Sequence, residues 1–387
     1  MLVKLKNYLD VKRGPGLPSE FYSEKGTLIR LTLGNFNYPS GGFKQNTSKK
    51  DIYYIGPIKD EYILNKDDLI TPLTEQVVGL LGETAWIPES NKYIQNGDIG
   101  LVIPIESKLN KKYCYYLLSS PLIKKQLSAG AQQTKIRHTS PDKIKDCVAP
   151  IPNIDLQRKI GNLLHIIDEQ IKNNSNMVEK LQVLSQTIFN KFFNNKIYEF
   201  NGILHDLCTL PSGFSFEPSY YVTGGKYKLI TIKNVNGIFV DTDRVDTLNE
   251  IPSRMKDYCN LTKGDILISL TGNVGRISIN SSSNCLLNQR VSKIVCSNDK
   301  YKFYLYLLLS TNYYQGKMQQ MASGTSQKNL SPLDVENLRI FIPDNIDEFN
   351  NATKNILCQL CEINTFSVRL QDLKNKILPL LINRQIE

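Results

Sequence analysis

Residues 156–193 read LQRKIGNLLHIIDEQIKNNSNMVEKLQVLSQTIFNKFF. Apolar residues recur in this stretch at alternating steps of four and three, which is the spacing of a helix that packs along one seam, as in a coiled coil. Polar residues fill the other faces, so the pattern predicts one uninterrupted helix about 57 Å long. The predicted seam consists of Ile160, Leu164, Ile167, Ile171, Asn174, Val178, Leu181, Leu184 or Ser185, and Ile188.

The same seam occurs again when the sequence is shifted by 189 residues. The motif Lys180-Leu-Gln-Val-Leu184 then falls on Arg369-Leu-Gln-Asp-Leu373. We therefore predict a second long helix over residues 345–382, paired antiparallel with the first. An internal brace with no other role is the alternative for both seams. The second seam consists of Phe349, Thr353, Ile356, Leu360, Ile363, Ser367, Leu370, Leu373 and Ile377.

The segments that precede the two helices also match, locally and in the same order. Each alternates short runs rich in Ile, Val, Tyr and Leu with Gly, Pro, Asn and Asp, as expected for a mixed domain with several strands. We expect an α+β fold with a pseudo-two-fold internal repeat: a domain at 1–152, a long helix at 153–197, a second domain at 198–343 and a second long helix at 344–387. Matched pairs include Gly82 with Gly272, Asn96–Ile103 with Asn288–Val295, Ser140-Pro141 with Ser331-Pro332, and Ile151-Pro152 with Ile342-Pro343.

The bulk composition is that of a soluble globular protein, 41% hydrophobic and 22% charged. The net charge of +10 favours a polyanionic partner, although a basic protein without such a partner remains an alternative. The N-terminus lacks the apolar core of a signal peptide, and the longest apolar run, around residues 303–309, is too short to cross a bilayer. We therefore expect a cytoplasmic protein that does not bind a membrane.

No set of residues has the pattern of a catalytic or metal site. The three histidines, His138, His165 and His205, are too few and too scattered for a metal cluster or a triad. The eight cysteines show neither a disulfide framework nor a double pair for zinc, and Cys358 and Cys361 lie within the second predicted helix without nearby histidine. The sequence predicts a protein without catalytic activity or a cofactor of its own.

A polar loop before the second helix has the chemistry of a nucleic-acid contact. In the loop Gly324 to Asn329, glycine frees the backbone, Thr325 and Ser326 offer hydroxyl donors, and Lys328 adds charge. Two amides, Gln327 and Asn329, have the donor and acceptor pair that recognises adenine. A surface loop that is merely polar is the alternative.

The matching loop of the first half, Gly130 to His138, is three residues longer. Its basic residues Lys135 and Arg137 fit phosphate or, for Arg137, guanine, and Gln132 and Gln133 accompany them. A polar surface loop is again the alternative.

A third candidate is the turn Thr271-Gly-Asn-Val-Gly-Arg276. Its glycines allow a backbone nest beside a phosphate, with Asn273 and Arg276 nearby, or else a plain hairpin turn between two strands. In the first half the sequence Gly82-Glu-Thr-Ala-Trp86 stands in place of Gly-Asn-Val-Gly-Arg, so its contacts are harder to identify.

The order of these features resembles the specificity subunit of type I restriction-modification systems. The resemblance covers the whole chain and rests on the two seams, the turn 271–276, the loop 324–332 and the Ile-Pro pair before each helix. It implies that each globular domain reads one half of a split site in double-stranded DNA. It also implies two methyltransferase subunits that dock on the helices and carry S-adenosylmethionine, and a separate motor-nuclease subunit.

The sequence is compatible with two classes of function. The first is a non-catalytic DNA-recognition scaffold, and the second is a two-lobed protein adaptor that does not recognise a DNA sequence. Apolar residues near the helix ends exceed what a two-helix contact can bury, so we expect a further partner surface there. These residues are Phe189, Phe192, Phe193, Leu378, Leu380 and Leu381.

Overall fold

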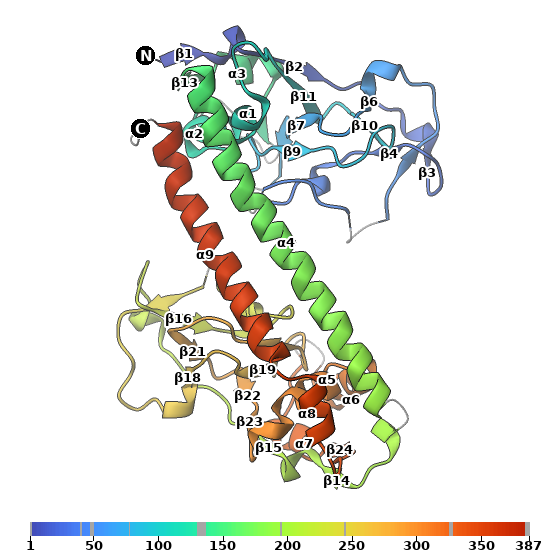
Figure 1. Ribbon diagram of the computed structural model, residues 1–387, viewed down its shortest axis with the longest axis vertical. Coiled ribbons are helices and arrows are strands. Elements are labelled where there is room, and N and C mark those ends of the chain that lie inside the picture. The colour runs from blue at the N-terminus through green and yellow to red at the C-terminus, as the bar shows by residue number, and fades with distance from the viewer. Residues whose placement is uncertain are drawn as a thin grey trace. The chain divides into compact units, whose positions relative to one another are not determined.

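The computed structural model describes residues 2–38, 41–46, 50–76, 78–129, 137–193, 196–243, 245–324 and 328–383. The chain divides into two compact units, of which unit 1 consists of residues 1–170 and 370–387 and unit 2 of residues 171–369. Each unit therefore contains one globular domain and a piece of each long helix, because the ends of the helices pack on the domains. Figure 1 labels the helices and most of the strands of the two units.

Unit 1 is built around an antiparallel four-stranded sheet in the order β2-β11-β7-β9. Strand β7 is buried along its whole length, as expected for an inner strand. A second sheet has the order β3-β5-β4-β10-β6, and two short pairs, β1-β13 and β12-β8, complete the domain. The strands are β1 Leu2–Lys4, β2 Leu9–Arg13, β3 Tyr22–Ser23, β4 Ile29–Arg30, β5 Tyr53–Tyr54, β6 Ile63–Leu64, β7 Leu69–Pro72, β8 Thr74–Glu75, β9 Ala85–Trp86, β10 Tyr93–Ile94, β11 Ile99–Pro104, β12 Arg137–His138 and β13 Val148–Pro150.

Three short helices cover this domain: α1 (Lys111–Leu118), α2 (Pro121–Ala129) and α3 (Pro141–Asp146). Helix α1 begins after Asn110, whose side chain accepts a hydrogen bond from the Tyr113 amide at 3.1 Å. Helix α3 begins after Ser140, which caps it in the same way, and Pro141 occupies the first turn, where a missing N–H costs nothing.

Unit 2 has the same plan. Its helices are α5 (Lys302–Leu309), α6 (Asn312–Met321) and α7 (Pro332–Glu336), and its main sheets have the orders β20-β19-β22 and β17-β16-β21-β18. The strands are β14 Gly202–Ile203, β15 Cys208–Thr209, β16 Tyr227–Ile230, β17 Thr247–Leu248, β18 Asn260–Leu261, β19 Ile266–Ser269, β20 Ile277–Ile279, β21 Cys285–Leu287, β22 Val291–Lys293, β23 Val295–Cys296 and β24 Arg339–Ile340.

The backbone hydrogen bonds of the two domains correspond one to one around the central strand. In unit 1 the Leu73 amide donates to the Asp98 carbonyl at 2.7 Å, and in unit 2 the Leu270 amide donates to the Arg290 carbonyl at 3.0 Å. The predicted repeat of a mixed domain is therefore confirmed, and Asp98 and Arg290 occupy equivalent positions.

A glycine that follows β2 in unit 1 and β15 in unit 2 shows the same correspondence. The Gly14 amide donates a hydrogen bond to the Ile99 carbonyl at 3.2 Å, and the Gly213 amide donates one to the Val291 carbonyl at 3.0 Å. An added Cβ at Gly14 would lie 2.4 Å from the Asn96 carbonyl oxygen, and the same substitution at Gly213 would meet a carbonyl at 2.3 Å. Both positions require glycine because the backbones pass so close.

Helix α4 spans Ile154–Phe193, which confirms the prediction of one uninterrupted helix. Its seam is buried at Ile160, Leu164 and Ile167 in unit 1 and at Asn174 and Val178 in unit 2. At the ambiguous position the structure buries Ser185 completely and leaves Leu184 48% exposed.

The second long helix is interrupted, and the prediction of an unbroken helix over 345–382 is wrong at residues 353–355. Helix α8 ends at Ala352 and α9 spans Ile356–Ile382, with α8 itself at Asp347–Ala352. Asn355 has φ +68°, a left-handed conformation that asparagine tolerates better than most residues. The Thr353 hydroxyl donates to the Phe349 carbonyl at 2.8 Å and so takes up one backbone acceptor at the end of α8.

The two long helices are antiparallel within each unit. In unit 1, Asp168 pairs with Lys374 at 2.6 Å, and Leu164, earlier in α4, shares a core with Ile382, later in α9. In unit 2, the Asn174 amide donates to the Ser367 hydroxyl at 2.9 Å. Further along α4, aromatic contacts join it to α8, which precedes α9 in the chain.

The apolar residues at the helix ends are used by the globular domains, so the prediction of a further partner surface there is wrong. Phe189 and Phe193 are 1% and 3% exposed and pack against Tyr304 with ring centroids 5.8 and 5.1 Å apart. Leu378 and Leu381 pack in the same way on the core of unit 1. A two-helix seam alone does not predict that the domains cover these positions.

Candidate nucleic-acid interface

Unit 2 contains a cavity of about 580 Å³ beside the end of strand β19. It brings the predicted residues Lys328 and Asn329 together with Arg290, which is distant from them in the sequence. The lining combines amide, hydroxyl and cationic side chains with a small apolar base. The lining residues are Ser212, Leu270, Thr271, Gln289, Arg290, Lys328, Asn329, Leu330, Ser331 and Pro332.

The backbone around this cavity is held by hydrogen bonds to a common strand end. The Leu270 amide donates to the Arg290 carbonyl at 3.0 Å, and the Leu270 carbonyl accepts from the Leu330 amide at 2.8 Å. One residue further on, the Gly272 amide donates to the Lys328 carbonyl at 2.9 Å. Three segments that are far apart in the sequence therefore present their side chains from one frame.

Three cations of this region are exposed: Arg276, Arg290 and Lys328. Within the described ranges, none of the three has an ion-pair partner; other cations of unit 2, such as Lys293 beside Asp265 at 2.8 Å, do. Unpaired cations on a fixed backbone are suited to neutralise phosphate groups, since their side chains need not abandon an internal partner.

The turn Thr271 to Arg276 is a tight hairpin between β19 and β20, which is the second of the two alternatives considered for this turn. Gly272 and Gly275 have φ of +70° and +77°, which explains both glycines. The Ser269 hydroxyl donates to the Asn273 carbonyl at 2.6 Å and accepts from the Arg276 amide at 3.0 Å. The side chains of Asn273 and Arg276 remain exposed, so the hairpin is compatible with the predicted contact.

Six of the predicted contact residues lie outside the described residues. They are Gln132, Gln133 and Lys135 in the loop of unit 1 and Thr325, Ser326 and Gln327 in the loop of unit 2.

Arg137, the remaining candidate of unit 1, has an internal role. Its guanidinium lies 3.1 Å from the Glu75 carboxylate and donates to the Ser128 carbonyl at 2.5 Å and hydroxyl at 2.8 Å. The Arg137 side chain is 19% exposed and that of Glu75 only 1%. This buried pairing argues against the contact with phosphate or guanine predicted for Arg137.

The sheet registers show which residues of the two units are equivalent. Strand β12 pairs with β8 in unit 1 so that His138 faces Thr74, and the corresponding bridge in unit 2 joins Asn329 to Thr271, which makes Arg137 equivalent to Lys328. The ladders β7-β9 and β19-β20 then match Gly82 with Gly275, which replaces the match of Gly82 with Gly272 suggested by sequence.

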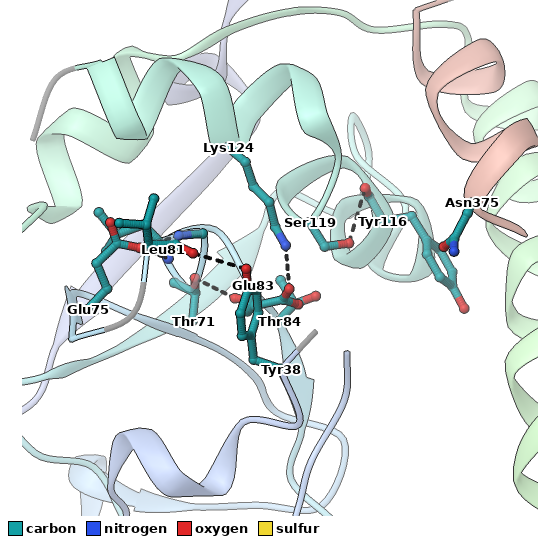
Figure 2. Close-up of polar contacts among 12 residues, drawn as sticks. Tyr38, Thr71, Glu75, Leu81, Glu83, Thr84, Tyr116, Ser119, Lys124 and Asn375 are labelled. Carbon is teal, nitrogen blue, oxygen red and sulfur yellow. Dashed lines mark hydrogen bonds and ion pairs between the residues drawn. The ribbon is translucent and has the colours of Figure 1, made fainter. Parts of the chain in front are cut away.

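Equivalent positions carry opposite charges in the two units. Asp98 of unit 1 occupies the position of Arg290, and Glu83 occupies that of Arg276. Glu83 is 3% exposed and pairs with Lys124, as Figure 2 shows, and its carbonyl accepts from the Thr71 hydroxyl at 2.8 Å. Burial raises the pKa of the Glu83 carboxyl, and Lys124 opposes that shift.

A comparison with known proteins identifies the family. A family model described as the type I restriction modification DNA specificity domain matches residues 3–182 and 201–366. The chain belongs to this family. The matched ranges contain both globular domains, most of α4 and the first part of α9, and they confirm the resemblance drawn from the sequence.

Individual relatives agree with this assignment. The chain is 22% identical over 348 residues to the type I restriction enzyme EcoBI specificity subunit of Escherichia coli, with 81% of this chain and 70% of the relative covered. It is 23% identical over 271 residues to the MjaVIII specificity subunit of Methanocaldococcus jannaschii, with 62% of each chain covered. A crystal structure of the type I restriction-modification S subunit from M. genitalium has a TM-score of 0.63 at 15% identity, covering 99% of this chain and 96% of that one.

As a type I specificity subunit, the chain is a DNA sequence-recognition subunit without catalytic activity of its own. No helix in the described part of the chain is long and apolar enough to cross a membrane, and the same residues contain no group of His, Cys, Asp and Glu arranged for a metal ion. Arg290 and Gln289 are contact candidates that sequence patterns do not identify. The only signal was the repeated match of Asn288–Val295 with Asn96–Ile103, which placed them at an equivalent strand start.

Proposed function

We propose that unit 1 and unit 2 each read one half of a bipartite site in double-stranded DNA, and that the chain directs methyltransferase subunits to that site. The cavity of unit 2 carries this proposal, because Arg290 and Lys328 line it without an ion-pair partner among the described residues, and Arg276 is exposed on the adjoining hairpin. The same frame recurs in unit 1 with different side chains. A shared frame with different side chains is what two half-sites of different sequence require.

The long helices supply the docking surface for partners in this proposal. In unit 1, Leu163 and Ile166 of α4 are 46% and 65% exposed, and in unit 2 Met177 and Val183 are 51% and 67% exposed. Exposed apolar residues along a helix that is otherwise polar favour a protein partner. We propose two methyltransferase subunits there, which carry the S-adenosylmethionine site, and a separate motor-nuclease subunit.

The domain boundaries at 152, 197 and 343 and a cytoplasmic location belong to the same proposal. Because type I systems act on DNA, the location follows from the substrate. The bounds of the long helices support these boundaries, since α4 begins at Ile154 and ends at Phe193, and the α8–α9 pair begins at Asp347.

A protein adaptor that binds no specific DNA sequence is the competing function. The exposed apolar residues of α4 fit an adaptor equally well. An adaptor, however, has no need of three unpaired cations around one frame. Binding of the full chain with its methyltransferase partner to a duplex of its methylated sequence, in competition with random duplex, separates the two. The proposal expects preference for the specific duplex and an affinity that falls steeply with salt. Equal affinity for both duplexes would support the adaptor.

A further inference from the structure

The loop between β8 and β9 in unit 1 has an apolar residue at its tip. Val78 is 66% exposed, whereas Glu75 before it is 1% exposed and Leu80 and Leu81 after it are 7% and 2% exposed. Leu80 packs in one core of the domain and Leu81 in another. The loop thus has both ends buried and presents Val78 to solvent.

A buried carboxylate holds the backbone that follows the tip. The Oε2 atom of Glu75 accepts hydrogen bonds from the amides of Gly79 at 3.0 Å and Leu81 at 2.9 Å, and its Oε1 atom lies 3.1 Å from the Arg137 guanidinium. Figure 2 shows the Glu75 carboxylate directed at the loop and bonded to Leu81. Hydrogen bonds to a charged acceptor are stronger than those to a neutral one, so the amides of Gly79 and Leu81 are held firmly.

Val78 itself is held through its own carbonyl. The Tyr38 hydroxyl donates to the Val78 carbonyl at 3.0 Å. Gly79 has φ +101°, and an added Cβ there would lie 2.5 Å from the Tyr38 hydroxyl oxygen. Gly79 and the buried Glu75 carboxylate therefore hold the exposed Val78 in one place.

This loop is equivalent in position to the hairpin Thr271 to Arg276 of unit 2, which is a candidate for DNA contact. Seven residues separate Thr74 from Gly82, and three separate the equivalent Thr271 from Gly275, so the loop of unit 1 is longer and Val78 lies in the extra part. Its neighbouring cations differ as well. Arg137 is paired with Glu75 and Lys124 with Glu83, so their charges are neutralised internally.

We propose that Val78 contacts the C5-methyl group of a thymine in the half-site read by unit 1, and that Glu75 is the positioning residue that holds Val78 in place. The proposal rests on the proposed function and deepens it. The thymine methyl is the apolar group that a base edge offers in the major groove. A side chain fixed before binding loses little conformational entropy on contact, which suits an apolar residue with no hydrogen bond to offer.

The test uses the full chain with its methyltransferase partners and a duplex of its methylated sequence. Each thymine of the half-site read by unit 1 is replaced in turn by deoxyuridine, which removes only the C5-methyl group. One replacement should weaken binding by the wild-type chain by about fourfold, the value of one buried methyl group. Val78→Ala should weaken binding to the thymine duplex and abolish the difference between thymine and deoxyuridine.

The control variant is Val222→Ala, which removes an exposed valine from the globular domain of unit 2, away from the long helices, and should keep the full discrimination. Glu75→Ala should reduce discrimination at the half-site of unit 1 and leave mismatch discrimination at the other half-site unchanged. Equal losses at both half-sites would overturn the positioning role of Glu75.

Three results would overturn the contact with Val78: no deoxyuridine weakens binding, Val78→Ala keeps the discrimination, or the half-site contains no A·T pair. A wild-type chain that binds its own site and random duplex equally would instead refute the proposed function. The two failures are therefore distinguishable.

Discussion

Arg137 and Lys328 occupy equivalent positions in the two units, but their surroundings differ. Arg137 is enclosed by Glu75 and Ser128, whereas Lys328 is exposed and has no ion-pair partner among the described residues. Residue type alone suggests the same contact for both. The buried Glu75 carboxylate gives Arg137 an internal partner, whereas Lys328 faces solvent.

The cations of unit 2 should therefore contribute to affinity through charge. Arg290→Ala and Lys328→Ala should each weaken binding to all duplexes alike and flatten the slope of log affinity against log salt by about one unit. Titrations of duplex at several salt concentrations measure this slope. The matched control is Lys293→Ala, since Lys293 is paired with Asp265 and should leave the slope unaltered. An unchanged slope for both Arg290→Ala and Lys328→Ala would place the DNA contacts elsewhere.

Gly275, in the hairpin between β19 and β20, should be intolerant of substitution. Gly275 has φ +77°, and an added Cβ would lie 3.0 Å from Cβ of Met318 in α6. Gly275→Ala should therefore destabilise unit 2 by about 1 to 2 kcal/mol. Hydrogen exchange of the unit 2 amides measures the effect. Gly316→Ala in α6, where an added Cβ meets nothing within 4 Å, should stabilise unit 2 instead; equal effects of both substitutions would contradict the account.

At the scale of elements, the helix seam of unit 1 contains a charged network. The ammonium group of Lys374 lies 2.6 Å from Asp168, and their side chains are only 10% and 26% exposed. The Tyr116 hydroxyl donates to the other oxygen of Asp168 at 2.7 Å, and the ammonium group lies 5.5 Å from the Tyr116 ring centroid. One network thus joins both long helices to α1.

Breaking this network from one side should be costly. Lys374→Met should destabilise unit 1 by about 2 kcal/mol, below the usual 3 to 5 kcal/mol for a fully buried pair because Asp168 is partly solvated. Urea unfolding followed by the fluorescence of Trp86, the single tryptophan, reports on unit 1. The double substitution Lys374→Met/Asp168→Leu should recover at least half of the loss. No recovery would mean that packing rather than charge holds the seam.

Sequence predicts the elements whose pattern is local. The apolar period of residues 156–193 predicts α4 and most of its seam, because a helix repeats its contacts every few residues. The break at 353–355 is missed, since Asn355 and Thr353 fit a helical pattern and only the domain around them makes a turn favourable. Leu373 shows the same limit: it follows the apolar period but is 46% exposed, and Lys374 beside it is buried.

The candidate site was predictable in part for the same reason. Lys328 and Asn329 belong to a short loop whose composition is visible in the sequence. Arg290 joins them only through a hydrogen bond from Leu270, a contact between segments far apart in the chain. The charge reversal between Asp98 and Arg290 likewise depends on strand register, which a weak sequence match does not specify.

At the scale of the whole molecule, the proposed function gives the chain two separate DNA-reading units with a common frame. Each unit has its own cores and its own hydrogen-bonded site, and the side chains at equivalent positions differ in charge. Recognition should therefore be modular: replacing one domain changes what that domain reads and leaves the other half of the site intact.

The most direct test exchanges residues 198–343 for the corresponding domain of a relative with a different site. Methylome sequencing of a host that carries this hybrid with the methyltransferase partner then gives the methylated sequence. The account predicts that one half of the bipartite sequence changes to that of the relative and the other half is retained. A methylated sequence that changes in both halves, or in neither, would contradict it.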